Sequence, residues 1–173
     1  MRSLARYFVL FVVAAGLGFV VVIWQLPSFI MGKLIDRVEA SSQNGRLAPP
    51  LPDDKARSIV LPSPDLAYVL CTYDLAKGSL AVTFNPPSLP YWSVAAYADN
   101  TDNFAVINDR NSGEMRQMIL VAPDKPMPLA PPDIRVVQAP STRGLILFRG
   151  LMPNRDPALQ QQVQQSVSCR GGN

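Results

Sequence analysis

Side chains with oxygen ligands gather in one short stretch of the sequence, between positions 99 and 109. The stretch holds three aspartates, Asp99, Asp102 and Asp109, and three asparagines at positions 100, 103 and 108. Carboxylate and amide oxygens bind calcium, and a pair of carboxylates can also serve a glycosidase. However, D-N-T-D-N lacks the alternating D-x-D-x-D-G spacing of a known calcium loop, and Asp and Asn are common turn residues. Turn formation is therefore the favoured interpretation, and the three aspartates remain candidate binding residues.

Three arginines form a second group that could bind a ligand: Arg110, Arg143 and Arg149. Arg149 lies within an apolar run, so its guanidinium either pairs with a carboxylate such as Asp74 or Asp109 or lines a pocket. The ion pair is the favoured interpretation. Arg110 and Arg149 are kept as candidate binding residues.

Aromatic residues offer a third possibility, a surface on which a carbohydrate or peptide stacks. Alternating aromatics in a β-rich domain more often form core and cross-strand pairs, and we favour that interpretation. Trp92 is nevertheless kept as a candidate binding residue. The aromatic residues considered are Tyr68, Tyr73, Tyr91, Trp92 and Tyr97.

The sequence contains no histidine and only two cysteines. This removes the usual general base near neutral pH, the Ser-His-Asp and Cys-His arrangements, and an ordinary structural zinc site. No catalytic or cofactor motif is present. We therefore expect a protein that is not an enzyme and that needs no cofactor or metal.

An apolar run of twenty residues, 7–26, decides where the rest of the chain resides. At about 1.5 Å per residue a helix of this length spans about 30 Å, the hydrocarbon thickness of a bilayer. The run is longer than the apolar core of a signal peptide, and Trp24-Gln25-Leu26-Pro27 follows in place of a small-x-small cleavage site. We favour a retained signal-anchor over a cleaved signal peptide or a buried helix of a soluble protein.

Arg2 and Arg6 precede the run, which favours a cytoplasmic N-terminus and an exported C-terminal domain, periplasmic in a bacterium. Without them the chain has 14 basic and 13 acidic residues, so it lacks the charge of a nucleic-acid-binding protein. If the domain is exported, Cys71 and Cys169 most simply form a disulfide; a buried thiol and an exposed tail thiol are the alternatives.

The chain divides into an anchor (1–32), an amphipathic extension with a Pro-rich linker (33–64), and a folded domain (65–173). Ile30, Leu34, Ile35 and Val38 have helical spacing, so we expect the helix to continue to about Ala40. The linker contains prolines 49, 50, 52, 62 and 64. Such a segment is extended and semi-rigid.

The folded domain is predicted to be mainly β, an antiparallel β-sandwich of about seven strands with a C-terminal helix. Turn signals at 77–78, 99–102 and 111–113 are expected to close hairpins. Asp156-Pro157 begins the helix, and Leu159, Val163 and Val167 repeat every four residues, which places Cys169 at its end. The strands are expected at 66–74, 79–85, 91–98, 103–108, 115–121, 134–138 and 143–149.

Several short motifs resemble the bacterial domain of unknown function 1254 family. They are YWSVAAY (91–97), TDNF (101–104), INDR (107–110), PDLAY (64–68), YDL (73–75), TRG (142–144) and LFR (147–149). The resemblance covers about residues 60–169, and the chain is similar to the short, membrane-anchored members that carry a single β-rich module. Longer relatives add a second module of the 1214 family, so the resemblance implies a separately encoded protein of that family as a partner.

These observations lead us to expect a single-pass inner-membrane protein whose periplasmic β-sandwich is a non-catalytic binding or assembly module of the bacterial envelope. The competing expectation is an enzyme subunit that acts with a separately encoded second module. Its site would lie near Arg149 and the carboxylates of residues 99–109.

Overall fold

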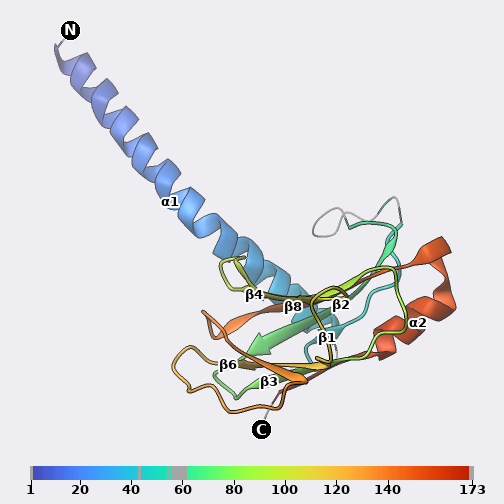
Figure 1. Cartoon of the computed structure of the whole chain (residues 1–173). Helices are drawn as coiled ribbons and strands as arrows, with labels where there is room; N and C mark the ends of the chain where they lie inside the picture. Colours follow the sequence, from blue (N-terminus) through green and yellow to red (C-terminus); the bar gives the residue numbers. More distant parts are fainter. Residues whose placement is uncertain (1, 43, 54, 56–61, 172–173) are drawn as a thin grey trace.

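Two β-sheets packed face to face contain most of the chain after residue 45, and one long helix leads into them (Figure 1). The computed structural model describes residues 2–42, 44–53, 55 and 62–171. The predicted mainly β sandwich, with a short C-terminal helix and an apolar N-terminal helix, is confirmed.

The first sheet has five strands that all pair antiparallel, in the order β1-β2-β8-β4-β5. The second sheet has four strands in the order β7-β6-β3-β9, and its β6–β7 pair is parallel. The strands of the first sheet are β1 (Arg46–Leu47), β2 (Leu66–Asp74), β4 (Trp92–Ala98), β5 (Asn103–Asn108) and β8 (Arg143–Leu151). Those of the second are β3 (Leu80–Phe84), β6 (Gln117–Val121), β7 (Ile134–Gln138) and β9 (Val167–Gly171).

The core lies between the two sheets and follows from the alternation of side chains along each strand. In β2 every second residue is buried, at positions 67, 69, 71 and 73, while the residues between them are half-buried. Phe84, Met118 and Phe148 are fully buried between the sheets. The outward-facing residues of the five-stranded sheet form a second surface, which is the one that the long helix meets.

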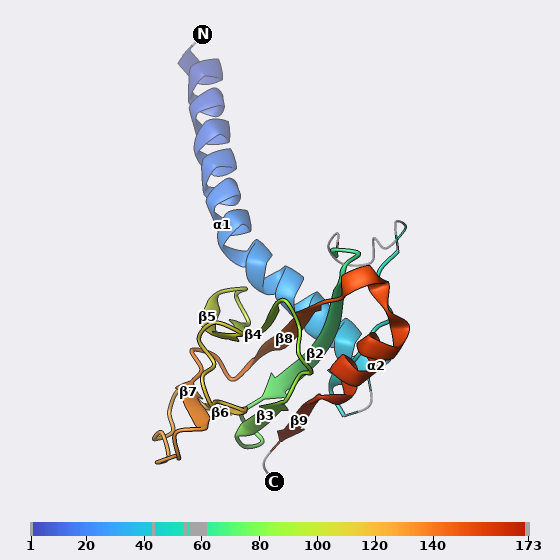
Figure 2. The same ribbon diagram turned by 45° about the vertical axis from the view of Figure 1, so that its right-hand side comes forward.

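The long helix α1 (Arg2–Ser41) continues through Pro27 and changes direction part-way along (Figure 2). It contains one stretch that is long and apolar enough to cross a membrane, and that stretch has no buried residues. Met31, Ile35 and Val38, which lie beyond this stretch at helical spacing, are buried against Leu145 of β8. The expected extension past Pro27 is therefore present, and it packs on the outer face of the five-stranded sheet.

Both lateral openings of the sandwich are bridged by an arginine. The strand orders place β5 beside β7 on one side and β1 beside β9 on the other. Arg135 of β7 donates a hydrogen bond to the backbone oxygen of Val106 in β5, at 3.0 Å. On the other side Arg46 of β1 donates to the backbone oxygen of Val167 in β9, at 3.1 Å. Residues 46–47 thus belong to the five-stranded sheet, although they precede residue 65, where the folded domain was expected to begin.

The C-terminal helix is shorter than predicted. Helix α2 (Pro157–Gln165) begins at the N-cap Asp156, whose carboxylate accepts a hydrogen bond from the backbone of Ala158, as the sequence indicates. It ends at Ser166, and the chain then forms β9, so Cys169 lies in a strand and not in a helix. Val167 is buried opposite Phe84, and this pairing with β3 outweighs the four-residue repeat that predicted a longer helix.

The predicted topology is wrong in two further respects. The turns at 77–78 and 111–113 do not close hairpins, because β2 and β5 lie in one sheet whereas β3 and β6 lie in the other. The sandwich is also not wholly antiparallel. The parallel β6–β7 pair requires the chain to cross over, and the Pro-rich residues 122–133 form this crossover loop.

Candidate functional site

The three candidate aspartates do not form one site. Asp99 and Asp102 lie at the tip of the β4–β5 hairpin, whereas Asp109 follows β5 at its opposite end. The six residues of β5 separate the two ends by roughly 20 Å. Within the described part of the chain there is no group of three His, Cys, Asp or Glu residues that could hold a metal ion.

The asparagines of this hairpin are occupied by turn hydrogen bonds. The Asn100 side-chain amide donates to the Asp102 carboxylate at 2.7 Å, and the Asp102 backbone donates to the Asn100 side chain at 3.1 Å. At the other end, the Asn108 side-chain oxygen accepts from the backbones of Arg110 and Asn111, each at 3.0 Å. These contacts are typical of turns and give Asn100, Asp102 and Asn108 a structural role.

Arg149 does not form the predicted ion pair with Asp74 or Asp109. The β2–β8 register places Asp74 opposite Arg143, at the far end of the strands, and its carboxylate lies 3.3 Å from the Lys77 ammonium. Arg149 instead lies opposite Tyr68 of β2 and Ser93 of β4. Its Nε atom is buried and has no hydrogen-bond partner among the described residues.

The aromatic residues do not share one surface. Trp92 is half-buried and packs on Phe148 and Phe84, with ring centroids 6.3 Å and 5.5 Å away. It borders a small hollow of about 130 Å³. Tyr73 points into the core, whereas Tyr97 packs with the cluster beneath α1. The core and cross-strand interpretation therefore describes the aromatics better than a stacking surface.

Tyr73 forms a buried polar contact at one end of the sandwich. Its hydroxyl donates to the backbone oxygen of Tyr97 at 3.0 Å. Burial raises the pKa of Tyr73 to about 12, with a smaller contribution from the Asp99 charge, against the lowering effect of a hydrogen bond with Ser141. A Cβ atom on Gly144, opposite Tyr73, would lie 2.3 Å from this hydroxyl and 2.2 Å from the Tyr97 oxygen. Position 144 therefore requires glycine, because the Tyr73 side chain and the Tyr97 backbone lie too close to it for any side chain to fit.

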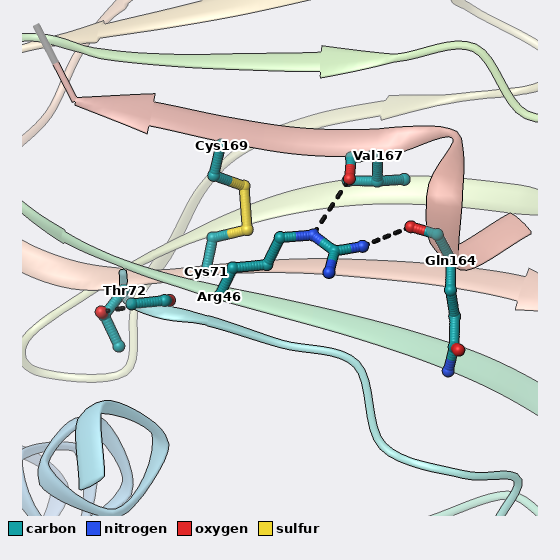
Figure 3. The surroundings of a disulfide bond; sticks show 7 residues. Arg46, Cys71, Thr72, Gln164, Val167 and Cys169 are labelled. Atoms are coloured by element: carbon teal, nitrogen blue, oxygen red, sulfur yellow. Dashed lines mark hydrogen bonds between the residues drawn. A yellow bond between two sulfur atoms is a disulfide. The ribbon is translucent and has the colours of Figure 1, made fainter. Parts of the chain in front are cut away.

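The two cysteines form a disulfide that joins the two sheets (Figure 3). Cys71 lies in β2 and Cys169 in β9, with their Cα atoms 6.4 Å apart. Beside the disulfide, the Arg46 guanidinium donates to the backbone oxygens of Gln164 and Val167. The chain that leaves α1 is thus tied to α2 and β9.

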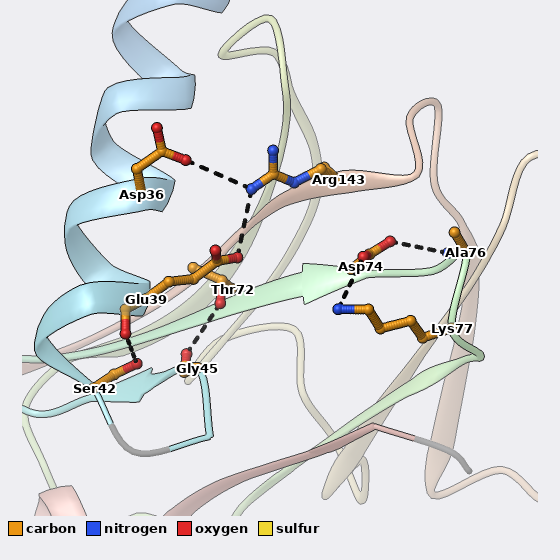
Figure 4. Close-up of polar contacts among 9 residues, drawn as sticks. All are labelled: Asp36, Glu39, Ser42, Gly45, Thr72, Asp74, Ala76, Lys77 and Arg143. Atoms are coloured by element: carbon orange, nitrogen blue, oxygen red, sulfur yellow. Dashed lines mark hydrogen bonds and ion pairs between the residues drawn. The ribbon is translucent and has the colours of Figure 1, made fainter.

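A hollow larger than the one beside Trp92 lies next to the end of α1, near the residues shown in Figure 4. It has a volume of about 290 Å³, and Glu39, Asp74 and Lys77 contribute its charged side chains. The charges are balanced locally, because Lys77 pairs with Asp74 and Arg143 lies 3.5 Å from Glu39. The sequence did not indicate this hollow, because its lining comes from segments far apart in the chain, including Glu39 of α1, Thr72 of β2 and Cys169 of β9.

Among the described residues outside α1, the crossover loop, residues 122–133, has the most exposed large apolar side chains. Met127 is 60% exposed and Leu129 is 104% exposed, and among the described residues these are the large apolar side chains beyond α1 with such exposure. The base of the loop is fixed by the Gln138 side chain, which donates to the backbone oxygens of Pro123 and Lys125 at 2.9 and 3.0 Å.

A family model described as a protein of unknown function, DUF1254, matches residues 45–171. The chain belongs to the DUF1254 family. The match begins just before β1 and ends at the last residue of β9, so this DUF1254 module consists of the whole sandwich, including the short edge strand. No curated protein matches the chain.

Two solved structures resemble this DUF1254 chain, and both belong to longer proteins. The VPA0106 protein from Vibrio parahaemolyticus is 16% identical, with a TM-score of 0.57 over 84% of this chain and 37% of its own. An uncharacterized protein from Burkholderia cenocepacia is also 16% identical, with a TM-score of 0.46 over 72% of this chain and 34% of its own. At these identities the likeness to VPA0106 supports the fold alone. The chain spans about a third of the length of either protein.

Proposed function

We propose that this protein is a membrane-anchored, non-catalytic binding or assembly module, and that the crossover loop is the segment that contacts a protein partner. The observation that carries the proposal is the exposure of Met127 and Leu129 in a loop that also holds five prolines, at positions 123, 126, 128, 131 and 132. Restricted backbones lose little conformational entropy on binding, and proline-rich segments commonly dock into apolar grooves.

The position of the loop supports this role. In Figures 1 and 2 the loop that connects β6 and β7 lies on the side of the sandwich away from the N-terminal half of α1. A membrane that contains this half of α1 would therefore leave the loop open to other proteins. The fixed base, held by Gln138, keeps the two apolar side chains outside the core.

The partner is proposed to be a separately encoded protein that supplies what longer relatives carry in one chain. The greater length of the VPA0106 protein, of which this chain covers 37%, supports the idea that the sandwich acts together with further structure. A protein of the 1214 family is the candidate for this partner. An enzyme subunit with Arg149 and the hairpin carboxylates in one site is a weaker proposal, because Asp99 and Asp109 lie at opposite ends of the hairpin.

The finer location is part of the proposal: inner membrane, N-terminus in the cytoplasm, sandwich in the periplasm. The apolar stretch of α1, the arginines that precede it and the Cys71–Cys169 disulfide support this arrangement. Protease added to spheroplasts should remove the sandwich from the membrane. Full protection in spheroplasts, with digestion only after lysis of the inner membrane, would contradict it.

The test is a crosslinking pull-down of the full chain from native membranes. Wild type is compared with Leu129→Ser and with Lys125→Ser, a matched change in the same exposed loop. We expect one protein to be crosslinked to wild type and to Lys125→Ser, and to be reduced at least tenfold with Leu129→Ser. Equal recovery with all three proteins, or no recovery above background with wild type, would contradict the proposal.

A further inference from the structure

Arg149 lies half-buried on the outer face of the five-stranded sheet. Its neighbours along β8, Phe148 and Gly150, are buried and face the core, so Arg149 faces outward with Leu145 and Leu147. Helix α1 covers Leu145.

No side chain directly opposite Arg149 carries a negative charge that would balance its guanidinium. The residues directly across the strands are Tyr68 and Ser93, and neither is charged. Asp65 and Asp109 lie just beyond β2 and β5 at the same end of the sheet, and neither forms an ion pair with Arg149. Among the described residues the guanidinium therefore has no acceptor, although a half-buried cation normally pairs with one.

The surrounding hydroxyls are arranged as donors. The Tyr68 hydroxyl accepts a hydrogen bond from the Ser63 backbone at 2.9 Å, which leaves its own proton free to donate. Ser93 is buried, and its hydroxyl accepts from Tyr91 at 2.8 Å. The Arg149 Nε atom is enclosed, whereas the residue as a whole is only half-buried. The Nη1–Nη2 edge is therefore the part of the guanidinium left for a ligand.

We propose that Arg149 and Tyr68 form a binding site for an oxyanion, a carboxylate or phosphate group, on the outer face of the five-stranded sheet. The guanidinium would donate two parallel hydrogen bonds through Nη1 and Nη2, the geometry that matches a carboxylate or phosphate edge. The Tyr68 hydroxyl would donate a third. This site is separate from the crossover loop and does not depend on it.

The experiment measures the thermal midpoint of the full chain in a maltoside detergent. Sodium phosphate and sodium acetate are compared with sodium chloride at equal ionic strength. A second arm uses nanodiscs of phosphatidylglycerol and of phosphatidylcholine, which separates a lipid phosphate from a soluble anion. We expect a rise of several degrees with at least one oxyanion at about 100 times its Kd. A rise confined to phosphatidylglycerol discs assigns the anion to a lipid headgroup.

Two variants decide whether Arg149 is responsible. Arg149→Met keeps an unbranched apolar side chain and should abolish the rise, with a midpoint in chloride no lower than that of wild type. Arg110→Met removes an exposed arginine at the same end of the sheet and should keep the rise. If Arg149→Met does not fold, Arg149→Gln replaces it under the same criteria.

The proposal is overturned by any of three results. The first is that the thermal midpoint of wild type does not rise with phosphate, acetate or phosphatidylglycerol. The second is that the rise in midpoint persists in Arg149→Met. The third is that Arg110→Met loses the rise equally, which would indicate general charge screening.

Discussion

Gly144→Ala is the substitution for which the structure gives the sharpest expectation. The added Cβ would lie 2.2 Å from the Tyr97 backbone oxygen, 2.3 Å from the Tyr73 hydroxyl and 2.4 Å from the Tyr73 ring. Neither neighbour can move freely. The Tyr97 oxygen belongs to β4, which is paired with β8, and the Tyr73 ring is 2% exposed and packed in the core.

The cost follows from these contacts. Overpacking a rigid core costs about 1–3 kcal/mol, and losing the Tyr73–Tyr97 hydrogen bond costs about 1 kcal/mol more. Alanine recovers about 0.5–1 kcal/mol of backbone entropy relative to glycine in a strand. We therefore expect the free energy of unfolding of Gly144→Ala to be about 1–3.5 kcal/mol lower than that of wild type.

Urea unfolding of the full chain in detergent measures this difference. Trp92 fluorescence reports on the sandwich if Trp24, in the apolar stretch of α1, is replaced by Phe in every variant. Gly171→Ala in β9 is the matched control, because its Cβ would meet nothing within 4 Å. Its stability should be unchanged or up to about 1 kcal/mol higher than that of wild type. If Gly144→Ala is as stable as Gly171→Ala, the close packing around Tyr73 is refuted.

Two further predictions concern the disulfide and Tyr73. Replacing Cys71 and Cys169 by serine should lower the free energy of unfolding by up to about 5 kcal/mol, because the bridge closes a loop with a sequence separation of 98. Reduction of wild type should lower its urea midpoint equally, and an unchanged midpoint would contradict this. Folding raises the Tyr73 pKa from 10.0 to about 12. The stabilisation that comes from keeping the Tyr73 hydroxyl protonated is therefore complete below pH 10 and is lost between pH 10 and 12. The free energy of unfolding should fall by at most about 1.4 kcal/mol per pH unit in this range. Urea unfolding across this range should show a steeper loss for wild type than for Tyr73→Phe, and parallel curves would contradict the shift.

Strands with clear apolar alternation and turn residues at both ends could be predicted from the sequence. The bounds of β2, β5 and β7 match the expected 66–74, 103–108 and 134–138. Strand β9 was missed because Val167 continues the four-residue spacing of α2, and only its pairing with β3 reveals a strand. The parallel β6–β7 pair was missed for a similar reason, since two runs separated by a Pro-rich loop do not reveal which way the chain returns.

The candidate site was less predictable than the fold because it depends on register. Proximity in sequence placed Asp99 and Asp109 together, whereas a strand of six residues separates them. Arg149 was identified as unusual from its apolar surroundings, but its lack of a carboxylate could be seen only once Tyr68 and Ser93 were known to lie opposite.

The central claim is that the crossover loop contacts a protein partner outside the membrane. The most direct test places a photo-crosslinking amino acid at position 129 in intact cells, and at position 161, an exposed glutamine of α2, as the control. We predict one discrete crosslinked product at 129 and none at 161. The absence of a product at 129, or the same products at both positions, would contradict the account.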